Sequence, residues 1–188
     1  MKTRDTVDGV PRLFFALSVP PTVSDELDGL CEGIPRARWA LENDFHITLS
    51  FLGEVERHRV RDVLDAAREV FVAPFALELS GAGVFPHRGE PRVLWIGCKP
   101  EERLMSLQRG LESALARASF PLERRKYHPH VTLARIERSP REPLADWLGH
   151  HLNFSAPPFK VFRFHLYSSV LTAQGSHYSI DESFTLRG

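Results

Sequence analysis

The tetrapeptide His46-Ile47-Thr48-Leu49 recurs in the second half of the chain as His130-Val131-Thr132-Leu133. Both copies lie in runs rich in β-branched and apolar residues, which favour strands. Because alternate side chains of a strand point to the same face, each copy would present an imidazole and a hydroxyl together. The chain is therefore expected to contain two strands with the same polar pair on one face, and together they offer two imidazoles.

The hydrophobic pattern divides the chain into two series of alternating elements. It predicts strands at 12–19, 45–52, 75–79, 92–98, 130–135, 160–168 and 177–186, the last two joined in a hairpin across Gln174-Gly175, and helices at 23–31, 55–71, 101–118 and 144–148. The two series, about 12–88 and 92–187, match in order and spacing, which indicates an internal duplication. Chance recurrence of alternating elements is the alternative. A duplication would set the two motif strands facing each other across a cleft.

No Gly/Ser/Pro linker separates the two series, so residues 1–188 are expected to form one domain, with residues 1–11 as a loose tail. The formal net charge of zero argues against a protein that coats long nucleic acids, but not against one that binds a nucleotide or an RNA end. Cys31 and Cys98 are in neither metal-binding nor redox spacing, and no apolar run is long enough to cross a bilayer. We therefore expect a cytoplasmic protein, away from the membrane.

Two imidazoles on opposite walls of a cleft suit displacement at phosphorus. The attacking and leaving oxygens of that reaction are roughly in line, so one proton acceptor and one proton donor are needed on opposite sides of the phosphate. Histidine titrates near neutral pH and can take either role, and each threonine could hydrogen-bond a phosphate oxygen. The sequence has no phosphate-binding loop and no His-Glu-x-x-His motif, so no metal and no cofactor is expected. The alternative is that the motifs are buried strand histidines beside ordinary β-forming threonines.

The segments around the motifs resemble a known family. FHITLSFLGEV at 45–55 and HPHVTLAR at 128–135 are similar to the two signature motifs of the bacterial and archaeal RNA 2′,3′-cyclic phosphodiesterases, historically called 2′-5′ RNA ligases, of the 2H phosphoesterase superfamily. The resemblance extends to RLFFALSVP at 12–20, RWALENDFHITLSFLGEV at 38–55, GVFPHRGEPRVLWIG at 83–97 and LYSSVLTAQGSHY at 166–178. It implies a bilobal α+β fold with antiparallel sheets lining a central cleft and helices outside.

The resemblance also implies an activity and roles for the motif residues. The activity is hydrolysis of terminal 2′,3′-cyclic phosphates to 2′-phosphomonoesters, accompanied by a reversible, ATP-independent 2′-5′ RNA ligase activity. His46 would be the proton donor and His130 the proton acceptor, while Thr48, Thr132 and Arg135 would bind the phosphate. Arg135 is five positions beyond His130, so on a regular strand it would point to the opposite face. One departure is His128, which stands where relatives usually carry an arginine before Pro-His.

Several further residues have both a functional and a structural interpretation. Arg125 and Lys126, in the run Arg124-Arg125-Lys126, could attract RNA or form an ordinary solvated loop. Phe85, expected in a Pro/Gly-rich loop, and Tyr178 could contact substrate, whereas Trp39 and Trp95 are expected in the core. The spacing of His128/His130 and of His150-His151 is poor for zinc. The cysteines are expected to be buried apolar residues.

The expected partners are RNA ends or nucleotides bearing a 2′,3′-cyclic phosphate, bound by a monomer with no obligate protein partner. Two alternatives keep the site but change the conclusion. The substrate could be a 2′-5′ oligonucleotide or a small cyclic phosphate. The chain could instead be a binding module for RNA ends or tRNA fragments, with incidental catalysis.

Overall fold

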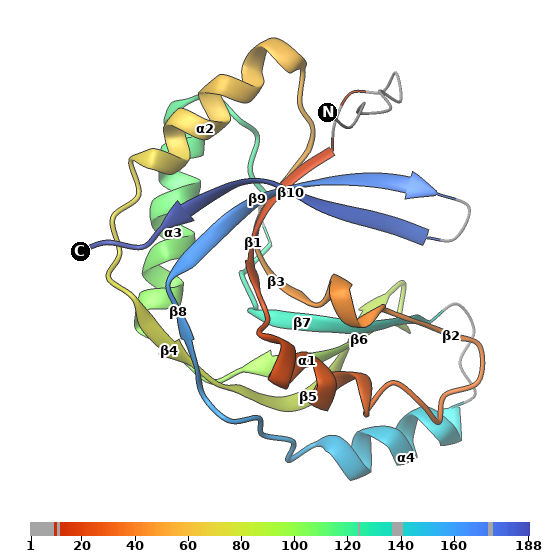
Figure 1. The fold of residues 1–188 in the computed structure, drawn as a ribbon. Helices are drawn as coiled ribbons and strands as arrows, with labels where there is room; N and C mark the ends of the chain where they lie inside the picture. The colour runs from red at the N-terminus through yellow and green to blue at the C-terminus, as the bar shows by residue number, and fades with distance from the viewer. Residues whose placement is uncertain (1–9, 11, 124, 137–140, 173–174) are drawn as a thin grey trace, which may run out of the picture.

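The computed structural model describes residues 10, 12–123, 125–136, 141–172 and 175–188, and shows a twisted antiparallel sheet with helices packed on it (Figure 1). The tail at 1–9, Arg124 and the Gln174 turn lie outside the described residues. In chain order the elements are β1 (Arg12–Ser18), α1 (Pro21–Asp28), β2 (Ala37–Trp39), β3 (His46–Glu54), α2 (Val60–Arg68), β4 (Phe75–Leu77), β5 (Leu79–His87), β6 (Glu90–Cys98), α3 (Glu102–Arg117), β7 (His130–Ile136), α4 (Arg141–His151), β8 (Phe159–Val161), β9 (Arg163–Thr172) and β10 (Gly175–Thr185). The fold is α+β, as expected.

Apart from β10 at one edge and the short β2, the order of the main sheet is symmetric about its centre. Its strands run β10-β9-β1-β3-β7-β6-β5, with β2 also paired to β7, and β4 pairs with β8 in a separate two-stranded sheet. The centre is the contact between β3 and β7, the two motif strands. The two repeats exchange strands: β5, which ends the first predicted repeat, pairs with β6, and β9, the next-to-last strand of the second, pairs with β1. Each half of the sheet therefore contains strands from both repeats.

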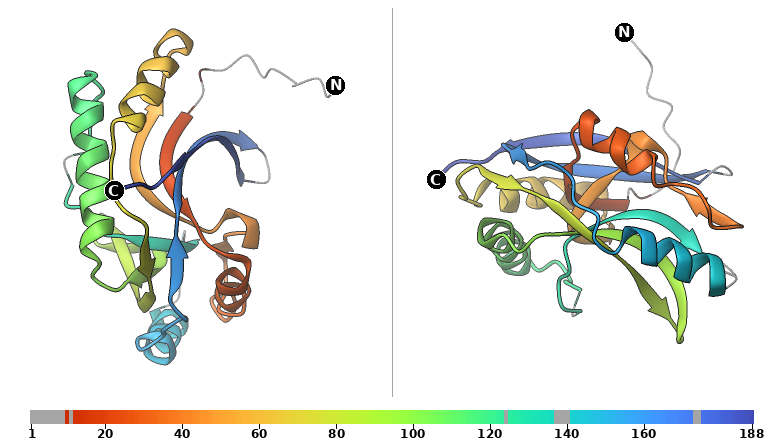
Figure 2. Two further views of the ribbon diagram at one scale, coloured as in Figure 1. Left: turned by 60° about the vertical axis from the view of Figure 1, so that its left-hand side comes forward. Right: turned by 90° about the horizontal axis from the view of Figure 1, so that it is seen from below.

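The main core lies between the sheet and the helices, and the views in Figure 2 show helices α2 and α3 running together along one side of the molecule. The leucine stripe predicted for α3 is fully buried: Leu104, Leu107, Leu111 and Leu115. At the other end, Trp147 of α4 donates a hydrogen bond from Nε1 to the carbonyl of Leu30 at 3.0 Å and lies 6.4 Å from the ring of Trp39. Trp39 is partly buried against the core, as predicted.

Several element boundaries differ from the sequence-based ones. The helix expected at 55–71 is α-helical only from Val60 to Arg68, after one 3-10 turn at Arg57–Arg59. The helix expected around 144–148 is longer, Arg141–His151. The run 75–79 is divided between β4 and β5, and β5 continues to His87. Phe85 therefore lies in a strand, and its expected place in a loop was wrong.

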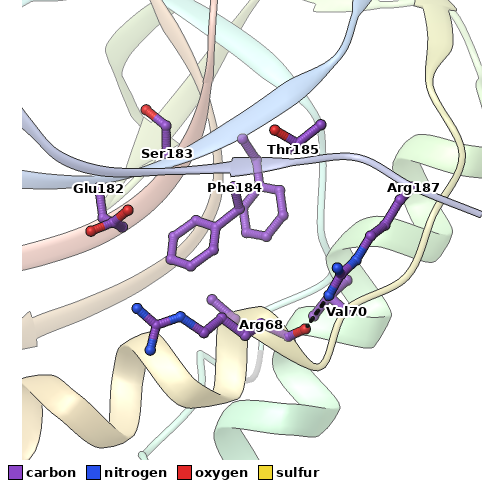
Figure 3. A pocket seen from close by; sticks show the side chains of 9 residues that line it. Arg68, Val70, Glu182, Ser183, Phe184, Thr185 and Arg187 are labelled. Carbon is purple, nitrogen blue, oxygen red and sulfur yellow. Dashed lines mark hydrogen bonds between the residues drawn. The ribbon is translucent and has the colours of Figure 1, made fainter.

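None of the helices in the described part of the chain is both long and apolar enough to span a membrane. A surface pocket lies between the C-terminal end of α2 and β10 (Figure 3), and stacked Phe164 and Phe184 rings, 4.9 Å apart, line it. Its Arg187 side chain donates a hydrogen bond to the Arg68 carbonyl. The pocket contains no motif residue, so it is separate from the candidate site below.

Candidate active site

The two motif strands place histidine and threonine on one face of the sheet, as the alternation predicted. Ile47 and Val131 are fully buried on the core side, whereas the flanking histidine and threonine of each motif are only partly buried. The first seven residues of β3 and the seven residues of β7 have the same sequence of buried and exposed positions. We call the face that carries His46, Thr48, His130 and Thr132 the motif face.

The register of β3 and β7 brings the two motifs together. The strands are antiparallel and meet at the pair Ile47–Val131. The residues that flank this pair then lie opposite each other, so that His46 is beside Thr132 and Thr48 is beside His130. The two histidines are diagonal neighbours, for which a regular ladder gives a separation of about 7–8 Å. The motif strands are thus adjacent at the centre of one sheet, and the expectation that they face each other from opposite walls of a cleft was wrong.

Both imidazoles are held by the same kind of hydrogen bond. Nδ1 of His46 lies 2.6 Å from the carbonyl oxygen of Asp44, and Nδ1 of His130 lies 2.6 Å from the carbonyl oxygen of His128. Because a carbonyl oxygen can only accept, Nδ1 must carry the proton in each ring. Nε2 of both histidines is therefore the nitrogen that can accept or donate a proton at the motif face.

Burial lowers the pKa of both histidines from the usual 6.5. For His46, burial has the largest effect on the pKa, the hydrogen bond to Asp44 opposes it, and the charge of His130 lowers it further. For His130, the same balance of burial and hydrogen bond is followed by the charges of His128 and Arg125, which also lower the pKa. Both rings therefore favour the neutral form, and an anion bound between them would favour protonation.

Arg135 lies on the motif face, against the expectation from simple alternation. The pairing of β7 with β6 skips one residue between Thr132 and Ala134, which is a β-bulge that reverses the alternation. Leu133 and Ala134 are both buried, and Arg135 is exposed. Directly opposite Arg135, on β2, lies Arg38, whose side chain shares its face. Arg38 could not be identified from the sequence, because β2 is too short for its alternation to be detected.

Aromatic rings surround both histidines. The ring centroid of Phe85 lies 4.7 Å from that of His130 in an edge-to-face arrangement. Tyr178 has the same relation to His46 at 5.1 Å, and Phe14 lies 5.0 Å from His46. The positions proposed for Phe85 and Tyr178 as substrate contacts are therefore beside the motif histidines.

Trp95 also lies at the motif face, so its expected place in the core was wrong. Its indole is 4.8 Å from the ring of His128 and 5.1 Å from that of Phe85. The cross-strand neighbour, Gly83, makes room for the indole, because a Cβ on Gly83 would overlap it. Trp95 Nε1 is buried and has no hydrogen-bond partner among the described residues.

The basic residues before the second motif are at the edge of this site. The guanidinium carbon of Arg125 lies 5.9 Å from the Phe85 ring, and the same side chain pairs with Glu123 at 3.2 Å. Lys126 is exposed. Between these residues and the motif, Tyr127 donates a hydrogen bond from its hydroxyl to the carbonyl of Thr48 at 3.1 Å, which connects the loop to the first motif.

The remaining candidates are away from the motifs or chemically inert. Within the described ranges no group of three or more His, Cys, Asp or Glu residues is arranged to hold a metal ion. His150 and His151 bond through Nδ1 to backbone carbonyls of α4. Burial raises the pKa of Cys31 and of Cys98 to about 12, so neither thiol is an activated nucleophile.

Comparisons with known proteins give one consistent result. Residues 24–172 match the family model described as the 2′-5′ RNA ligase superfamily. The chain is 32% identical over 177 residues to the RNA 2′,3′-cyclic phosphodiesterase of Thermotoga maritima, with 90% of this chain and 92% of that protein covered. It is 31% identical to the Archaeoglobus fulgidus protein of the same name, over 89% of this chain and 96% of that protein.

Solved structures show the same relationship. Protein TT0787 of Thermus thermophilus superposes with a TM-score of 0.78 at 29% identity and covers 94% of this chain and 98% of its own. The apo form of E. coli LigT gives a TM-score of 0.76 at 26% identity, with 96% and 100% covered. E. coli LigT has also been solved with 3′-AMP, at a TM-score of 0.72, 25% identity and coverages of 95% and 99%.

Proposed function

The chain belongs to the 2′-5′ RNA ligase superfamily, and we propose on this basis that it hydrolyses terminal 2′,3′-cyclic phosphates of RNA to 2′-phosphomonoesters. The observation that carries the proposal is the matched pair of imidazoles. Each has Nδ1 fixed on a backbone carbonyl at 2.6 Å and Nε2 left for proton transfer, on adjacent antiparallel strands. A binding module would have no use for two imidazoles oriented in this way.

The reaction assigns opposite tasks to the two Nε2 atoms. His130 accepts a proton from water as the water oxygen attacks phosphorus in line with the 3′ oxygen. The P–O3′ bond breaks, and His46 donates a proton to the departing 3′ oxygen. The product is a 3′ hydroxyl and a 2′-phosphomonoester. The two histidines have then exchanged protonation states, which solvent restores.

The electrostatic surroundings support this assignment of acid and base. The charges of His128 and Arg125 disfavour a proton on His130, which suits a base that must be neutral before reaction. His46 is partly buried among aromatic rings, so its protonated form needs a nearby anion, and the substrate phosphate supplies one. The acid is thus charged chiefly when substrate is bound.

Thr48, Thr132 and Arg135 complete the site as phosphate ligands in this proposal. In the register of β3 and β7, each threonine lies beside the histidine of the other motif on the motif face. Arg135 supports the phosphate from the motif face of β7, where its planar guanidinium can donate two hydrogen bonds. In this proposal side chains supply all the chemistry. Turnover without a metal ion is therefore a prediction, and a chelator can test it.

The first experiment uses an oligoribonucleotide that ends in a 2′,3′-cyclic phosphate, incubated with the protein in EDTA. We expect a 2′-phosphate product, and loss of turnover by roughly 10²–10⁴-fold in His46→Ala and in His130→Ala. His150→Ala is a matched control, because His150 also bonds a carbonyl through Nδ1 but belongs to α4. Full activity in either motif variant would contradict the assigned roles, and inhibition by EDTA would contradict metal independence.

We also propose that the protein works as a monomer in the cytoplasm, on RNA ends and nucleotides. Cys31 and Cys98, both free thiols, are consistent with a reducing compartment. A single species of the monomer mass in size-exclusion chromatography with light scattering would support the oligomeric state, and a stable dimer would refute it.

A further inference from the structure

The motif face continues from the catalytic strands onto β1 and β9. Alternate residues of β1 are buried in the main core: Leu13, Phe15 and Leu17. Ser18 therefore belongs to the opposite face, the motif face, where it is the cross-strand partner of His46. The register of β1 with β9 pairs Ala16 with His165, and two residues further it sets Ser18 opposite Arg163. Arg163, Ser18 and His46 thus follow one another across three neighbouring strands.

The two outer strands, β9 and β10, carry polar side chains on this face. The stacked rings of Phe164 and Phe184 lie in the core, so the residues next to them in sequence point to the motif face: Arg163, His165, Ser183 and Thr185. Figure 3 shows Ser183 and Thr185 on the side of β10 away from α2. We call these four residues, together with Ser18, the polar strip. It combines one cation, one imidazole and three hydroxyls.

His165 connects two of the hydroxyls of the polar strip. Its Nδ1 lies 2.8 Å from Oγ of Ser183, and its Nε2 lies 3.4 Å from Oγ of Ser18. The histidine is 8% exposed, whereas both serines are exposed. Burial and then the charge of Arg163 lower the pKa of His165, so the guanidinium acts on this ring. The imidazole therefore orients two hydroxyls that stay open to a ligand.

Arg163 gives the polar strip a positive charge. Its side chain is exposed, and it has no ion-pair or hydrogen-bond partner among the described residues. Of the nearby carboxylates of β10, Asp181 accepts a hydrogen bond from Ser168, and Glu182 lines the pocket on the opposite face (Figure 3). A guanidinium and hydroxyls are donors with which proteins bind phosphate groups. The polar strip is thus suited to a phosphate.

The proposed reaction determines which part of the substrate lies over the polar strip. Attack in line puts water on the His130 side of phosphorus and the departing 3′ oxygen on the His46 side. The 3′ oxygen belongs to the ribose, so the ribose extends from phosphorus past His46, towards β1 and β9. Neighbouring strands are about 4.8 Å apart, so β9 lies about 10 Å from β3. The group attached to the far side of the ribose, at O5′, therefore extends towards the polar strip.

We propose that the polar strip binds the phosphate on O5′ of the terminal nucleotide, with Arg163 supplying the charge and Ser18 and Ser183 donating hydrogen bonds. The inference rests on the proposed function, which places the cyclic phosphate between the two motif histidines. The phosphate on O5′ is a phosphodiester in an RNA end and a phosphomonoester in a free nucleotide, and the same donors recognise both. A cyclic nucleotide with a free 5′ hydroxyl would leave the polar strip empty and be a poorer substrate.

The test compares three substrates with the full-length protein: adenosine 2′,3′-cyclic phosphate, the same compound with a 5′ phosphate, and the dinucleotide ApA with the same cyclic end. We expect kcat/KM to be about tenfold higher for the two substrates with a phosphate on O5′, the value of a weak hydrogen bond to a charged group. Arg163→Gln should remove this advantage and leave kcat/KM for the unphosphorylated substrate within about twofold of wild type.

Three variants make the test specific to the polar strip. Arg163→Lys keeps the charge and should retain part of the advantage of the 5′ phosphate. Ser183→Ala should reduce the advantage about two- to tenfold, the value of one hydrogen bond. Lys160→Gln is the matched control: it removes an exposed charge from β8, in the separate two-stranded sheet, and should retain the full advantage. Turnover of the unphosphorylated substrate reports folding of every variant.

The outcomes separate this inference from the proposed function. An advantage that is absent in wild type, or that survives Arg163→Gln, would refute the inference while hydrolysis itself stands. A gain confined to ApA would also refute it, because the additional nucleoside and not the phosphate would then be bound. Gains for both phosphorylated substrates support it: the larger gain for ApA indicates an RNA end, and the larger gain for the 5′ phosphomonoester indicates a free nucleotide.

A binding measurement tests the polar strip without turnover. If wild type hydrolyses none of the three substrates, the proposed function fails. Calorimetry then compares adenosine 2′,5′-bisphosphate with adenosine 2′-phosphate. We expect the bisphosphate to bind about tenfold more tightly to wild type, and equally tightly as the monophosphate to Arg163→Gln. Equal Kd values for the two ligands in wild type would refute the phosphate site.

Discussion

Replacement of Gly83 by alanine tests whether the Trp95 indole is held in a defined position against the site. A Cβ on Gly83 would overlap Cζ2 and Cη2 of the indole and lie 2.9 Å from Cε2. These atoms belong to a rigid ring packed between Phe85 and His128, so the ring cannot yield by a simple rotation. Overpacking of this kind costs about 1–3 kcal/mol of unfolding free energy.

The assay is urea unfolding, with thermal melting as a second measure. For a chain of this size each kcal/mol corresponds to about 2–4 °C, so Gly83→Ala should lower Tm by roughly 2–12 °C. The cost should largely vanish in a Trp95→Leu background, which removes the ring. Gly149→Ala is the control: no atom lies within 4 Å of its added Cβ, and as a helical substitution in α4 it should be neutral or stabilise by up to about 1 kcal/mol.

Whether the effects of the two substitutions on the unfolding free energy are additive shows whether Gly83→Ala acts through the indole. A double-mutant cycle over Gly83 and Trp95 should give a coupling free energy of about 1–3 kcal/mol. An equal loss of stability from Gly83→Ala with and without the indole would refute the reasoning, because the cost would then come from the backbone of β5. A Gly83→Ala protein as stable as wild type would refute it as well.

The buried histidines and Arg135 give three further measurable outcomes. Burial lowers the pKa of His46 and His130, so the bell-shaped profile of kcat/KM should have its maximum below pH 6.5, and a maximum above pH 7 would contradict the assignment. His165 is also buried with a lowered pKa, so folding favours the neutral form of all three rings. Their contribution to the unfolding free energy is fully present above about pH 6.5 and should be lost as the pH drops towards 5. An unfolding free energy from urea titrations that does not change over this pH range would refute this. Arg135→Gln should reduce kcat/KM on cyclic phosphate by about 10- to 150-fold, the value of a hydrogen bond to a charged group. Arg61→Gln, which changes an exposed side chain of α2, is the control and should leave kcat/KM unchanged. Equal values of kcat/KM for the two variants would show that Arg135 does not bind the phosphate.

The elements that could be predicted from the sequence are those set by local alternation. In β3 and β7, histidine and threonine share a face because side chains alternate, and that requires no knowledge of the neighbours. The same is true of α3, where leucines at helical spacing are buried. The matching order of elements indicated a duplication. The pairing of β3 with β7 in one sheet and the exchange of β5 and β9 between halves could not be predicted, since both depend on packing between distant segments.

The errors have two physical causes. Arg135 was expected on the far face because a β-bulge is a property of the register between two strands and leaves no mark in either sequence alone. Trp95 was expected in the core because its strand is apolar on both faces. One of those faces is lined with aromatic rings of the site, and an apolar residue there cannot be distinguished by composition from one in the core.

The pairing of β1 with β9 also determines when this site can form during synthesis. Arg12 pairs with Ser169 and Phe14 with Tyr167, so β1 must wait for a strand that is synthesised much later. Contacts between such distant residues make folding slow, and until β9 arrives the aromatic face of β1 has no cover. A nascent chain that already carries both histidines is therefore expected to be inactive and prone to aggregate, and both properties should change together only after β9 and β10 have been synthesised.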